Sequence, residues 1–591
     1  MMILLEGDSY SVLFSFLGIM IKYLAKKNTV IFVLSLIGII LTNYSAILAF
    51  SHQHYFVFEH DAYMHMVLAL NALKSHQWYA GINPFINAPY GADTHAWTQA
   101  TMIVLLSGAY FFKLFFPLKK ALYVWCFILP MLCNLLSVFA LLWTVRPLKT
   151  TNSQDFFLVI AFLLNPVMHF VYQPLRVDYD FLLVFTSIVY WGCLLRFISV
   201  NNRFWACLTA IVAGLGIWIS ISFTIVVFIG LAAIFWLYLV GNQLNATNIY
   251  LSLSVLCLSL ALIIPLEYRH FATISYDVVS IVYLAFYLLV LVCFFIYNRC
   301  LKTTNNALNL ISILGLAVLL FLVMNYYFPG FYKGPYNAVN PYLLKNFFPN
   351  SIEFYSPFVI DNSLVLALFF YFIVGAGYCY YLYLNREITI LQLLILFGAT
   401  VTSLLTAYMN RWGRLATPLN IILISFFVAY LANSKIHRLI KWLIIGLIIL
   451  LPSILSIISR NPVSEGVLQC QKQFYSIIED NILELPQFSQ DKILFTSSNY
   501  GPFILYFTHF AVVATNDHHN PMGLEDTFNF FKEDESAAKS MIRRRNIDLI
   551  LLCSGGASPI FDLEHSGWVE RIHLPEKYSK WRLYHVLQGV P

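Results

Sequence analysis

Long apolar stretches separated by short polar connections fill most of the chain up to residue 459. A helix needs about 20 predominantly apolar residues to cross the hydrocarbon core of a bilayer. Because the backbone must satisfy its own hydrogen bonds there, each stretch predicts a membrane-spanning helix. Two shorter or interrupted stretches, residues 11–25 and 101–117, predict interfacial or re-entrant helices. Thirteen spans are predicted: residues 29–50, 121–143, 155–172, 181–198, 204–220, 222–240, 248–266, 278–297, 307–327, 362–384, 389–408, 415–433 and 439–459.

The pattern changes after residue 459, where the chain becomes charged and gains turn signals such as Ser554-Gly555-Gly556. A helix-like stretch, Glu533–Asn546, alternates with short apolar runs, which favours a small α/β domain. We therefore expect a transmembrane domain over residues 1–459 and a soluble α/β domain over residues 460–591. The predicted strands are Ile493–Thr496, Ala511–Ala514, Leu549–Cys553 and Trp581–Val586.

Composition supports an all-α polytopic membrane fold followed by this small domain. Hydrophobic residues make up 60% of the chain and charged residues only 11%, whereas a soluble protein carries about a quarter charged residues. The net charge of +6 is too small to indicate nucleic-acid binding. The sequence holds no P-loop, dinucleotide-binding glycine pattern or G-x-S-x-G elbow, so nothing indicates an ATP-driven pump.

The positions of basic residues predict the orientation, because Lys and Arg are retained on the cytoplasmic side of a membrane. With the N-terminus inside, segments 51–100, 173–180, 328–361 and 460–591 all fall on the opposite face. Residues 1–10 contain two acidic residues and no basic one, so we predict no cleavable signal peptide. The predicted cytoplasmic basic residues are Lys22, Lys26, Lys27, Arg146, Lys149, Arg196, Arg203, Arg299, Lys302, Arg386, Lys435, Arg438 and Lys441.

Two acidic motifs fall on this outer face. Asp61 lies in the segment Glu59–His65, just after the first span. One interpretation is that it caps a helix beginning at Ala62, and such a cap is compatible with a functional carboxylate. The second motif contains Asp178 and Asp180, in the eight-residue loop 173–180. A D-x-D pair offers hard oxygen ligands to Mg²⁺ or Mn²⁺. Alternatively, Asp180 caps the following span and Asp178 pairs with Arg176.

Two further positions carry candidate chemistry. Glu353 lies in the loop 328–361, which is long for a connection between spans, although a loop glutamate is more often a solvated charge. Arg411 and Arg414 lie at the outer end of a span. An arginine fork suits a phosphate group, but an interfacial arginine that extends to the lipid headgroups is the alternative.

The sequence leaves two points open: whether histidines form a zinc site, and whether two of the cysteines form a disulfide. His518 and His519 follow Asp517, and more histidines crowd the first outer loop, but their spacing matches no known zinc-ligand pattern. Eight of the ten cysteines fall in apolar segments. Cys470 and Cys553 lie in the polar part and could pair if that part faces an oxidising compartment. The loop histidines are His52, His54, His60, His65, His76 and His95.

Together these features resemble the GT-C glycosyltransferases, especially the catalytic subunit of oligosaccharyltransferases and its single-subunit prokaryotic relatives. Members of that family have thirteen spans, acidic motifs in the first outer loop and in a short later loop, a glutamate in a long loop, and a soluble C-terminal domain. The resemblance matches Asp61 to the first acidic position, Asp178 and Asp180 to the second pair, Glu353 to the loop glutamate, and Arg411 or Arg414 to the phosphate-binding arginine.

The chain departs from the family at two motifs. The family has Ser or Thr three residues before the loop glutamate, where this chain has Asn350. The family's WWDYG motif, which reads the acceptor sequon, is matched only by Ser497-Ser498-Asn499-Tyr500-Gly501. Both tryptophans and the aspartate are missing, although Asn499, Tyr500 and Gly501 remain the candidate acceptor-binding residues. The acceptor therefore need not be an Asn-x-Ser/Thr sequon, and both a protein and a glycan are candidate acceptors.

The resemblance implies an inverting, metal-dependent transfer from a polyprenyl-phosphate- or pyrophosphate-linked sugar donor whose lipid lies among the membrane lipids. It implies Mg²⁺ or Mn²⁺ held by Asp61, Asp178 and Glu353, with Asp61 or Asp180 orienting or deprotonating the acceptor. We expect a multi-pass protein of a bacterial inner membrane, with its site on the periplasmic side. Two alternatives are a GT-C enzyme acting on a lipid or cell-surface glycan, and a transporter or flippase, although the spans hold few of the charges that transporters use.

Overall fold

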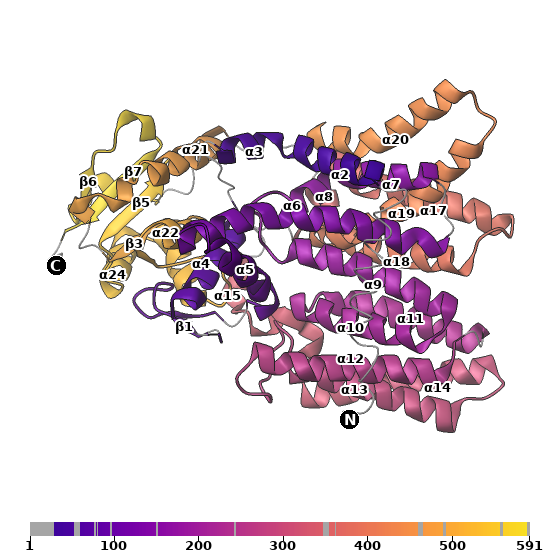
Figure 1. Cartoon of the computed structure of the whole chain (residues 1–591). Helices are drawn as coiled ribbons and strands as arrows, with labels where there is room; N and C mark the ends of the chain where they lie inside the picture. The colour runs from indigo at the N-terminus through magenta and orange to yellow at the C-terminus, as the bar shows by residue number, and fades with distance from the viewer. Residues whose placement is uncertain are drawn as a thin grey trace.

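The structure is a computed structural model that describes residues 29–51, 59–75, 78–79, 81–94, 97–148, 152–241, 244–346, 354–360, 362–458, 465–488, 492–555 and 559–587. Long apolar helices lie side by side in a bundle, and a sheet with its own helices covers one end of it (Figure 1). The predicted all-helical membrane fold with a small C-terminal α/β part is therefore confirmed.

The bundle helices occur where the apolar stretches predicted them. Among the described residues, nine helices are long and apolar enough to cross a membrane. The stretches 155–172, 204–220 and 222–240 form shorter helices, so the total of thirteen spans stays a prediction. The bundle helices are α2 (Thr29–Thr42), α3 (Tyr44–Ser51), α6 (Leu118–Val145), α7 (Asn152–Leu164), α8 (Pro166–Val171), α9 (Asp180–Val200), α10 (Arg203–Ile219), α11 (Phe223–Gly241), α12 (Ala246–Glu267), α13 (Ile281–Ile296), α14 (Asn306–Tyr327), α17 (Asn362–Leu384), α18 (Ile390–Tyr408), α19 (Gly413–Asn433) and α20 (Arg438–Ile458).

Two of the predicted spans are broken by polar residues. The stretch 29–50 bends by 66° between α2 and α3, where the Asn43 side chain donates to the Ile39 carbonyl at 2.9 Å and so competes with the helical hydrogen bonds. The stretch 155–172 breaks at Asn165, whose side chain caps α8, and Pro166 suits the first turn of that new helix.

Close packing between helices depends on small residues. At Gly375 of α17, a Cβ atom would lie only 2.8 Å from the backbone nitrogen of Ile424 in α19. The absence of a side chain lets these two helices approach each other closely, as small residues do between membrane helices. This contact holds the middle of α19 against α17.

Shorter helices lie at the end of the bundle that faces the sheet (Figure 1). The stretch 101–117 forms the short apolar helix α5, while the predicted helix 11–25 lies outside the described residues. Tyr63 of α4 packs against Phe503 and Phe507 of α22, with ring centroids 4.6 and 5.5 Å apart. These rings attach α4 to the C-terminal part. The short helices are α4 (His60–Ser75), α5 (Gln99–Phe112), α15 (Pro341–Asn346) and α16 (Pro357–Ile360), and a small hairpin joins β1 (Ile82–Asn83) to β2 (Ala92–Asp93).

The C-terminal part contains a five-stranded sheet in the order β4-β3-β5-β7-β6. Strand β3 is parallel to β4 and β5, whereas β7 is antiparallel to β5 and β6. Four of these strands and α24 occur where the sequence predicted them; β6 and three helices were not predicted. The elements are α21 (Glu465–Glu479), β3 (Ile493–Phe495), α22 (Gly501–Phe507), β4 (Ala511–Val512), α23 (Pro521–Lys532), α24 (Glu535–Arg544), β5 (Leu549–Cys553), β6 (Val569–Ile572) and β7 (Trp581–Val586).

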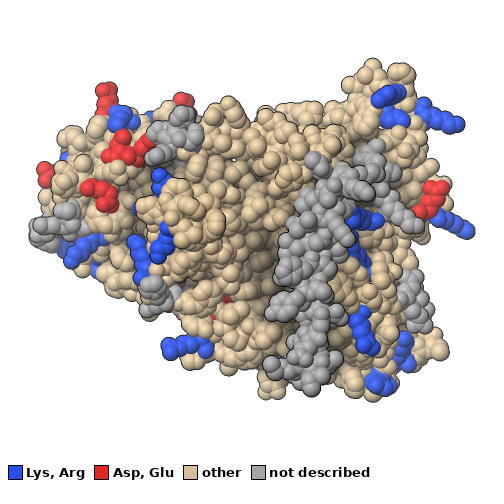
Figure 2. Space-filling model, in the orientation of Figure 1, with Lys and Arg blue, Asp and Glu red and all other residues tan. Residues whose placement is uncertain are grey.

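The two ends of the bundle carry different charged residues. Figure 2 shows mostly Lys and Arg projecting from the end opposite the sheet, and both signs of charge at the sheet end. The middle of the bundle in this view is almost free of charged side chains, as a lipid-facing surface requires. The exposed basic residues at the far helix ends are Arg146, Arg203, Arg299, Lys302, Arg386, Lys435 and Arg438.

Candidate functional site

The first acidic motif lies at the beginning of α4. The helix begins at His60, so the interpretation of Asp61 as a cap before Ala62 is wrong: Asp61 lies inside the first turn. Glu59, His60 and Asp61 bring potential ligand atoms within 4.8 Å of one another, and His60 Nε2 lies 3.6 Å from Asp61 Oδ1. The side chain of Asp61 is 36% exposed, which leaves it accessible from outside.

Arg176 links the two acidic motifs. It is buried, its Nε donates to Glu59 Oε2 at 3.3 Å, and its Nη1 lies 3.4 Å from Asp180 Oδ2. Its guanidinium stacks 3.9 Å from the ring centroid of Phe170. Loop 173–180 therefore contacts the start of α4, as the predicted grouping of the outer loops requires.

A second link runs through His65, one turn after Asp61 on α4. His65 Nε2 lies 3.9 Å from Asp178 Oδ1, and both side chains are buried. Residues four positions apart share a helix face, so Asp61 and His65 are on the same side of α4. The edge of the His65 ring also packs on Trp97, with centroids 4.6 Å apart. Neither His65 nor Trp97 was singled out as a site residue from the sequence.

The Asn410–Arg414 segment completes this cluster. Arg414 is buried and forms an ion pair with Asp180, so the interpretation as an arginine extended to the headgroups is wrong for this residue. Arg411 is half-buried, and its Nη2 donates to Tyr179 Oη at 2.7 Å. The structure thus joins the predicted phosphate-binding arginines to the second acidic motif.

Burial sets the electrostatics of the site. Burial, and then the charge of Asp180, raise the pKa of Asp178 well above its ordinary value, against the effect of the nearby arginines. Burial also lowers the pKa of His65 to about 3, so its ring is neutral at physiological pH. Without a cation, Asp178 therefore favours its neutral, protonated form. A bound cation would stabilise its negatively charged form instead. These residues could hold a divalent metal.

The predicted loop glutamate, Glu353, lies outside the described residues. The nearest described residue of that loop, Phe354, has its ring centroid 5.6 Å from the guanidinium of Arg411. The part of the loop that is described thus reaches Arg411 of the Asn410–Arg414 segment. The position of the Glu353 carboxylate stays a prediction.

The candidate acceptor residues lie where β3 passes into α22. Asn499 is exposed and accepts a hydrogen bond from Asn516 Nδ2 at 2.6 Å, while Tyr500 is buried. Gly501 begins α22, where a Cβ atom would lie 2.1 Å from the Ala514 carbonyl oxygen. Only glycine permits this approach, which brings the segment after β3 against the segment after β4.

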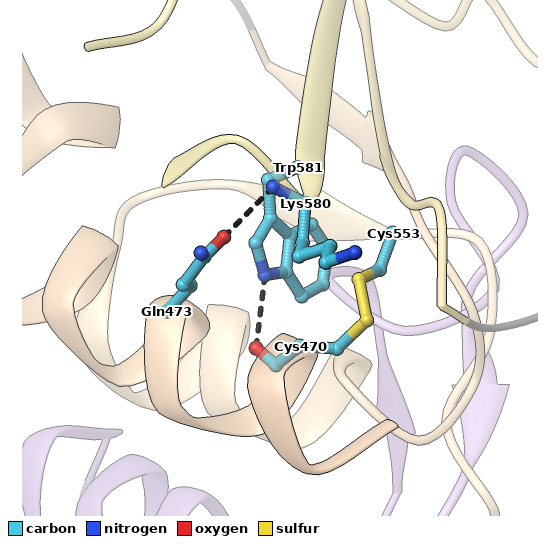
Figure 3. Close-up of a disulfide and its surroundings, with 5 residues drawn as sticks. All are labelled: Cys470, Gln473, Cys553, Lys580 and Trp581. Carbon is cyan, nitrogen blue, oxygen red and sulfur yellow. Dashed lines mark hydrogen bonds between the residues drawn. A yellow bond between two sulfur atoms is a disulfide. The ribbon is translucent and has the colours of Figure 1, made fainter. Parts of the chain in front are cut away.

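A cavity and a disulfide lie beside this segment. The cavity has a volume of about 230 Å³ and is bordered by Asn499, Tyr500 and Trp581 among others. Cys470 of α21 forms a disulfide with Cys553 of β5 along its wall, with Cα atoms 6.0 Å apart (Figure 3). Trp581 Nε1 donates to the Cys470 carbonyl at 2.9 Å. The sequence left this pairing open, and the structure joins the two cysteines.

No protein-family model and no curated protein matches the chain. Solved structures of an oligosaccharyltransferase from the archaeon Archaeoglobus fulgidus do match. Its apo form has a TM-score of 0.65 at 16% identity over 88% of this chain and 69% of that one. The complex of this enzyme, AglB, with an inhibitory peptide and a dolichol-phosphate has a TM-score of 0.62 at 15% identity, over 83% of this chain and only 65% of that chain. The protein is thus an integral membrane protein whose fold is similar to that of an archaeal oligosaccharyltransferase, as its sequence predicted.

Proposed function

We propose that this protein is a membrane glycosyltransferase that moves a glycan from a polyprenyl-phosphate or pyrophosphate carrier to a protein at the outer face of the membrane. The observation that carries the proposal is the contact of both acidic motifs with each other and with Arg411 and Arg414, on a fold shared with an oligosaccharyltransferase. The solved neighbours hold a dolichol-phosphate with an inhibitory peptide, or an acceptor peptide containing an NVT sequon, which fits a lipid-linked donor and a peptide acceptor.

A divalent cation fits the acidic residues. Asp178 is buried beside His65, whose two ring nitrogens have no hydrogen-bond partner among the described residues. The group at Glu59, His60 and Asp61 supplies mainly oxygen ligands, which suits Mg²⁺ or Mn²⁺, while one neighbour structure holds Zn and sulfate. Asp61 and Asp178 would hold the cation, with Glu353 as a third ligand. When bound, it would neutralise charge on the leaving phosphate.

The contacts assign different roles to the remaining residues. Asp180 is engaged by Arg176 and Arg414, so it serves to position Arg414 rather than to accept a proton. Asp61 is the exposed carboxylate and is left to orient the acceptor nucleophile. Arg411 is held by Tyr179 and only half-buried, so it is the arginine that would contact the donor phosphate. Attack from the side opposite the phosphate would invert the anomeric centre.

The orientation follows from the same arrangement. We place the protein in a bacterial inner membrane, with the site and the C-terminal domain, from residue 460, on the periplasmic side. Basic side chains at the opposite end of the bundle support this placement. The disulfide between Cys470 and Cys553 supports an oxidising compartment for the C-terminal domain.

A second candidate function is transfer to a lipid or cell-surface glycan. It is favoured by one observation: Ser497, Ser498 and Asn499 stand where the sequon-reading motif has two tryptophans and an aspartate. A site without those side chains has no evident means of reading a sequon. The acceptor test below separates the two functions.

The experiment is glycan transfer by the purified protein, using extracted lipid-linked glycans and either a fluorescent Asn-x-Thr peptide or membrane lipids as the acceptor. We expect product on the peptide, loss of product with chelator, and recovery with Mn²⁺. Asp61→Asn and Asp178→Asn should abolish transfer while expression is unchanged, and exposed Asp562→Asn serves as the control. Near wild-type transfer by either site variant would refute the assignment.

A further inference from the structure

A second group of potential metal ligands lies at the junction of the bundle and the C-terminal part. His518 and His519 belong to the segment between β4 and α23, and Asp277 to the loop between α12 and α13. Each offers one ligand atom, and these atoms all lie within 4.8 Å of one another. His519 Nε2 faces Asp277 Oδ2 at 2.9 Å, and the two histidine rings lie 4.4 Å apart.

The histidine segment is held in place from both sides. Asp517 accepts from the His519 backbone nitrogen at 2.9 Å through Oδ1 and from Trp97 Nε1 at 3.1 Å through Oδ2. Asn520 then caps α23 by accepting from the Gly523 nitrogen at 3.0 Å. The segment that carries the two imidazoles is therefore fixed by hydrogen bonds of Asp517 and Asn520, in addition to the contact of His519 with Asp277, and such preorganisation favours ligand binding.

The loop that carries Asp277 is also ordered by its own hydrogen bonds. Ser280 Oγ donates to the Ser275 carbonyl at 2.6 Å, and Tyr283 Oη donates to the Tyr276 carbonyl at 2.8 Å. These bonds bracket Asp277, whose side chain is only 9% exposed. Its Oδ1 is buried and accepts no hydrogen bond from any described residue. A buried carboxylate oxygen without a donor is costly unless a cation satisfies it.

The ligand types differ from those of the catalytic cluster. Two imidazoles and one carboxylate are a set that zinc prefers, whereas the cluster around Asp61 and Asp178 is rich in oxygen. A simple ion pair would need only His519 and Asp277, and it would leave Asp277 Oδ1 without a donor among the described residues. Burial lowers the pKa of His519, but the hydrogen bond to Asp277 and the negative charges of Asp517, Asp277 and Asp93 together outweigh burial and raise that pKa. A negative environment of this kind also attracts a metal ion.

We propose that Asp277, His518 and His519 form a zinc-type site that joins the C-terminal part to the loop after α12. Tetrahedral ligands about 2.0–2.2 Å from zinc lie roughly 3.3–3.6 Å apart. The ligand atoms here lie within 4.8 Å of one another, so small side-chain adjustments suffice. Three protein ligands leave a fourth position for water or another small ligand. The site shares no residue with the proposed catalytic metal site, and it does not depend on the proposed glycosyl transfer.

The test uses the full-length protein in detergent, with Asp61→Asn and Asp178→Asn already present to disable the catalytic cluster. After chelation and reloading with Zn²⁺, we expect one zinc per chain by elemental analysis and the visible absorption of tetrahedral Co²⁺ after reloading with cobalt. His519→Ala or Asp277→Asn should weaken zinc binding by more than about 100-fold, because one of three ligands is lost.

The matched control is His565→Ala, since His565 forms a similar pair with Asp562 at 2.7 Å but on the surface; it should retain zinc fully. Melting curves with and without Zn²⁺ guard against misfolding: a variant that folds but gains no stability from zinc supports the site. The proposal is overturned if the parent protein retains no zinc after reloading, or if His518→Ala, His519→Ala and Asp277→Asn all bind zinc as tightly as the parent.

Discussion

Arg414 and Asp180 form a buried ion pair that joins the first turn of α19 to the first residue of α9. Removing one partner of a buried pair leaves an uncompensated charge and costs about 3–5 kcal/mol. Asp180 keeps its contact with Arg176 at 3.4 Å, so we expect Arg414→Met to cost about 3 kcal/mol. Thermal melting in detergent would measure this loss as a lower melting temperature.

The control for this prediction is Arg571→Met. Arg571 pairs with Glu564 at 2.9 Å, but both side chains are solvent-accessible, and exposed pairs contribute less than about 1 kcal/mol. Adding Asp180→Leu to Arg414→Met should restore part of the stability but no transfer activity. If Arg414→Met melts at the wild-type temperature, the pair has no structural importance.

Tyr179 orients Arg411 through its hydroxyl group. Arg411 Nη2 donates to Tyr179 Oη at 2.7 Å, and a hydrogen bond to a charged group contributes about 1.5–3 kcal/mol. If Arg411 contacts the donor phosphate, Tyr179→Phe should raise the KM for the lipid-linked donor about 10-fold, with a smaller effect on kcat. Transfer rates at varied donor concentration would measure the change.

Tyr342→Phe is the matched control, because the Tyr342 hydroxyl also makes a 2.7 Å hydrogen bond, to Asn529, away from the acidic motifs. Its KM for the donor should equal the wild-type value. An unchanged KM in Tyr179→Phe would remove Arg411 from the donor site.

The sequence could predict which residues gather at the site, but not which side chains form ion pairs with one another. Asp61, Asp178 and Arg414 lie in connections that the basic-residue pattern places on one face, so their proximity follows from counting spans. That Arg176 reaches back to Glu59, and that Asp180 pairs with Arg414, depends on how helices distant in sequence pack. Asp277 gave no signal because a lone acid in a connection is usually solvated, and its histidine partners come from the other end of the chain.

Some elements of the fold were likewise predictable from the sequence, and others were not. Apolar length predicted the long helices, yet it concealed the break at Asn165, where an asparagine cap followed by proline is a helix start signal. Strand β6 was not predicted because Glu570 and Arg571 interrupt its apolar character, as exposed edge strands often do. Strands β5 and β7, which are mostly buried, were predicted from their apolar runs.

The disulfide should stabilise the C-terminal part. Cys470 and Cys553 are separated by 83 residues, and closing a loop of that length stabilises the folded state by about 4.5 kcal/mol in the chain-entropy model. The double variant Cys470→Ser/Cys553→Ser should therefore melt at a lower temperature than the wild type. Cys300→Ser, which removes an exposed free cysteine, should change nothing. Alkylation of both cysteines without prior reduction would show that the bond does not form.

Glu267 should hold α5 in place through hydrogen bonds to its first turn. It is buried at the end of α12, accepts from the Gln99 nitrogen at 3.1 Å, and accepts from Trp218 Nε1 at 2.7 Å through Oε2. Glu267→Ala would leave these donors buried without a partner, at about 1–3 kcal/mol each. We expect a clear fall in melting temperature.

Glu267→Gln tests whether the hydrogen bonds or the negative charge of Glu267 hold α5, because glutamine keeps an acceptor oxygen but has no charge. The amide oxygen of glutamine can still accept from one of the two donors, so this variant should lose roughly half as much stability as Glu267→Ala. Because α5 packs against α4, which carries Asp61, the loss of the α5 contact should also lower transfer more in the alanine variant than in the glutamine variant. Equal melting temperatures for the two variants would mean that the charge of Glu267, not its geometry as an acceptor, fixes the helix.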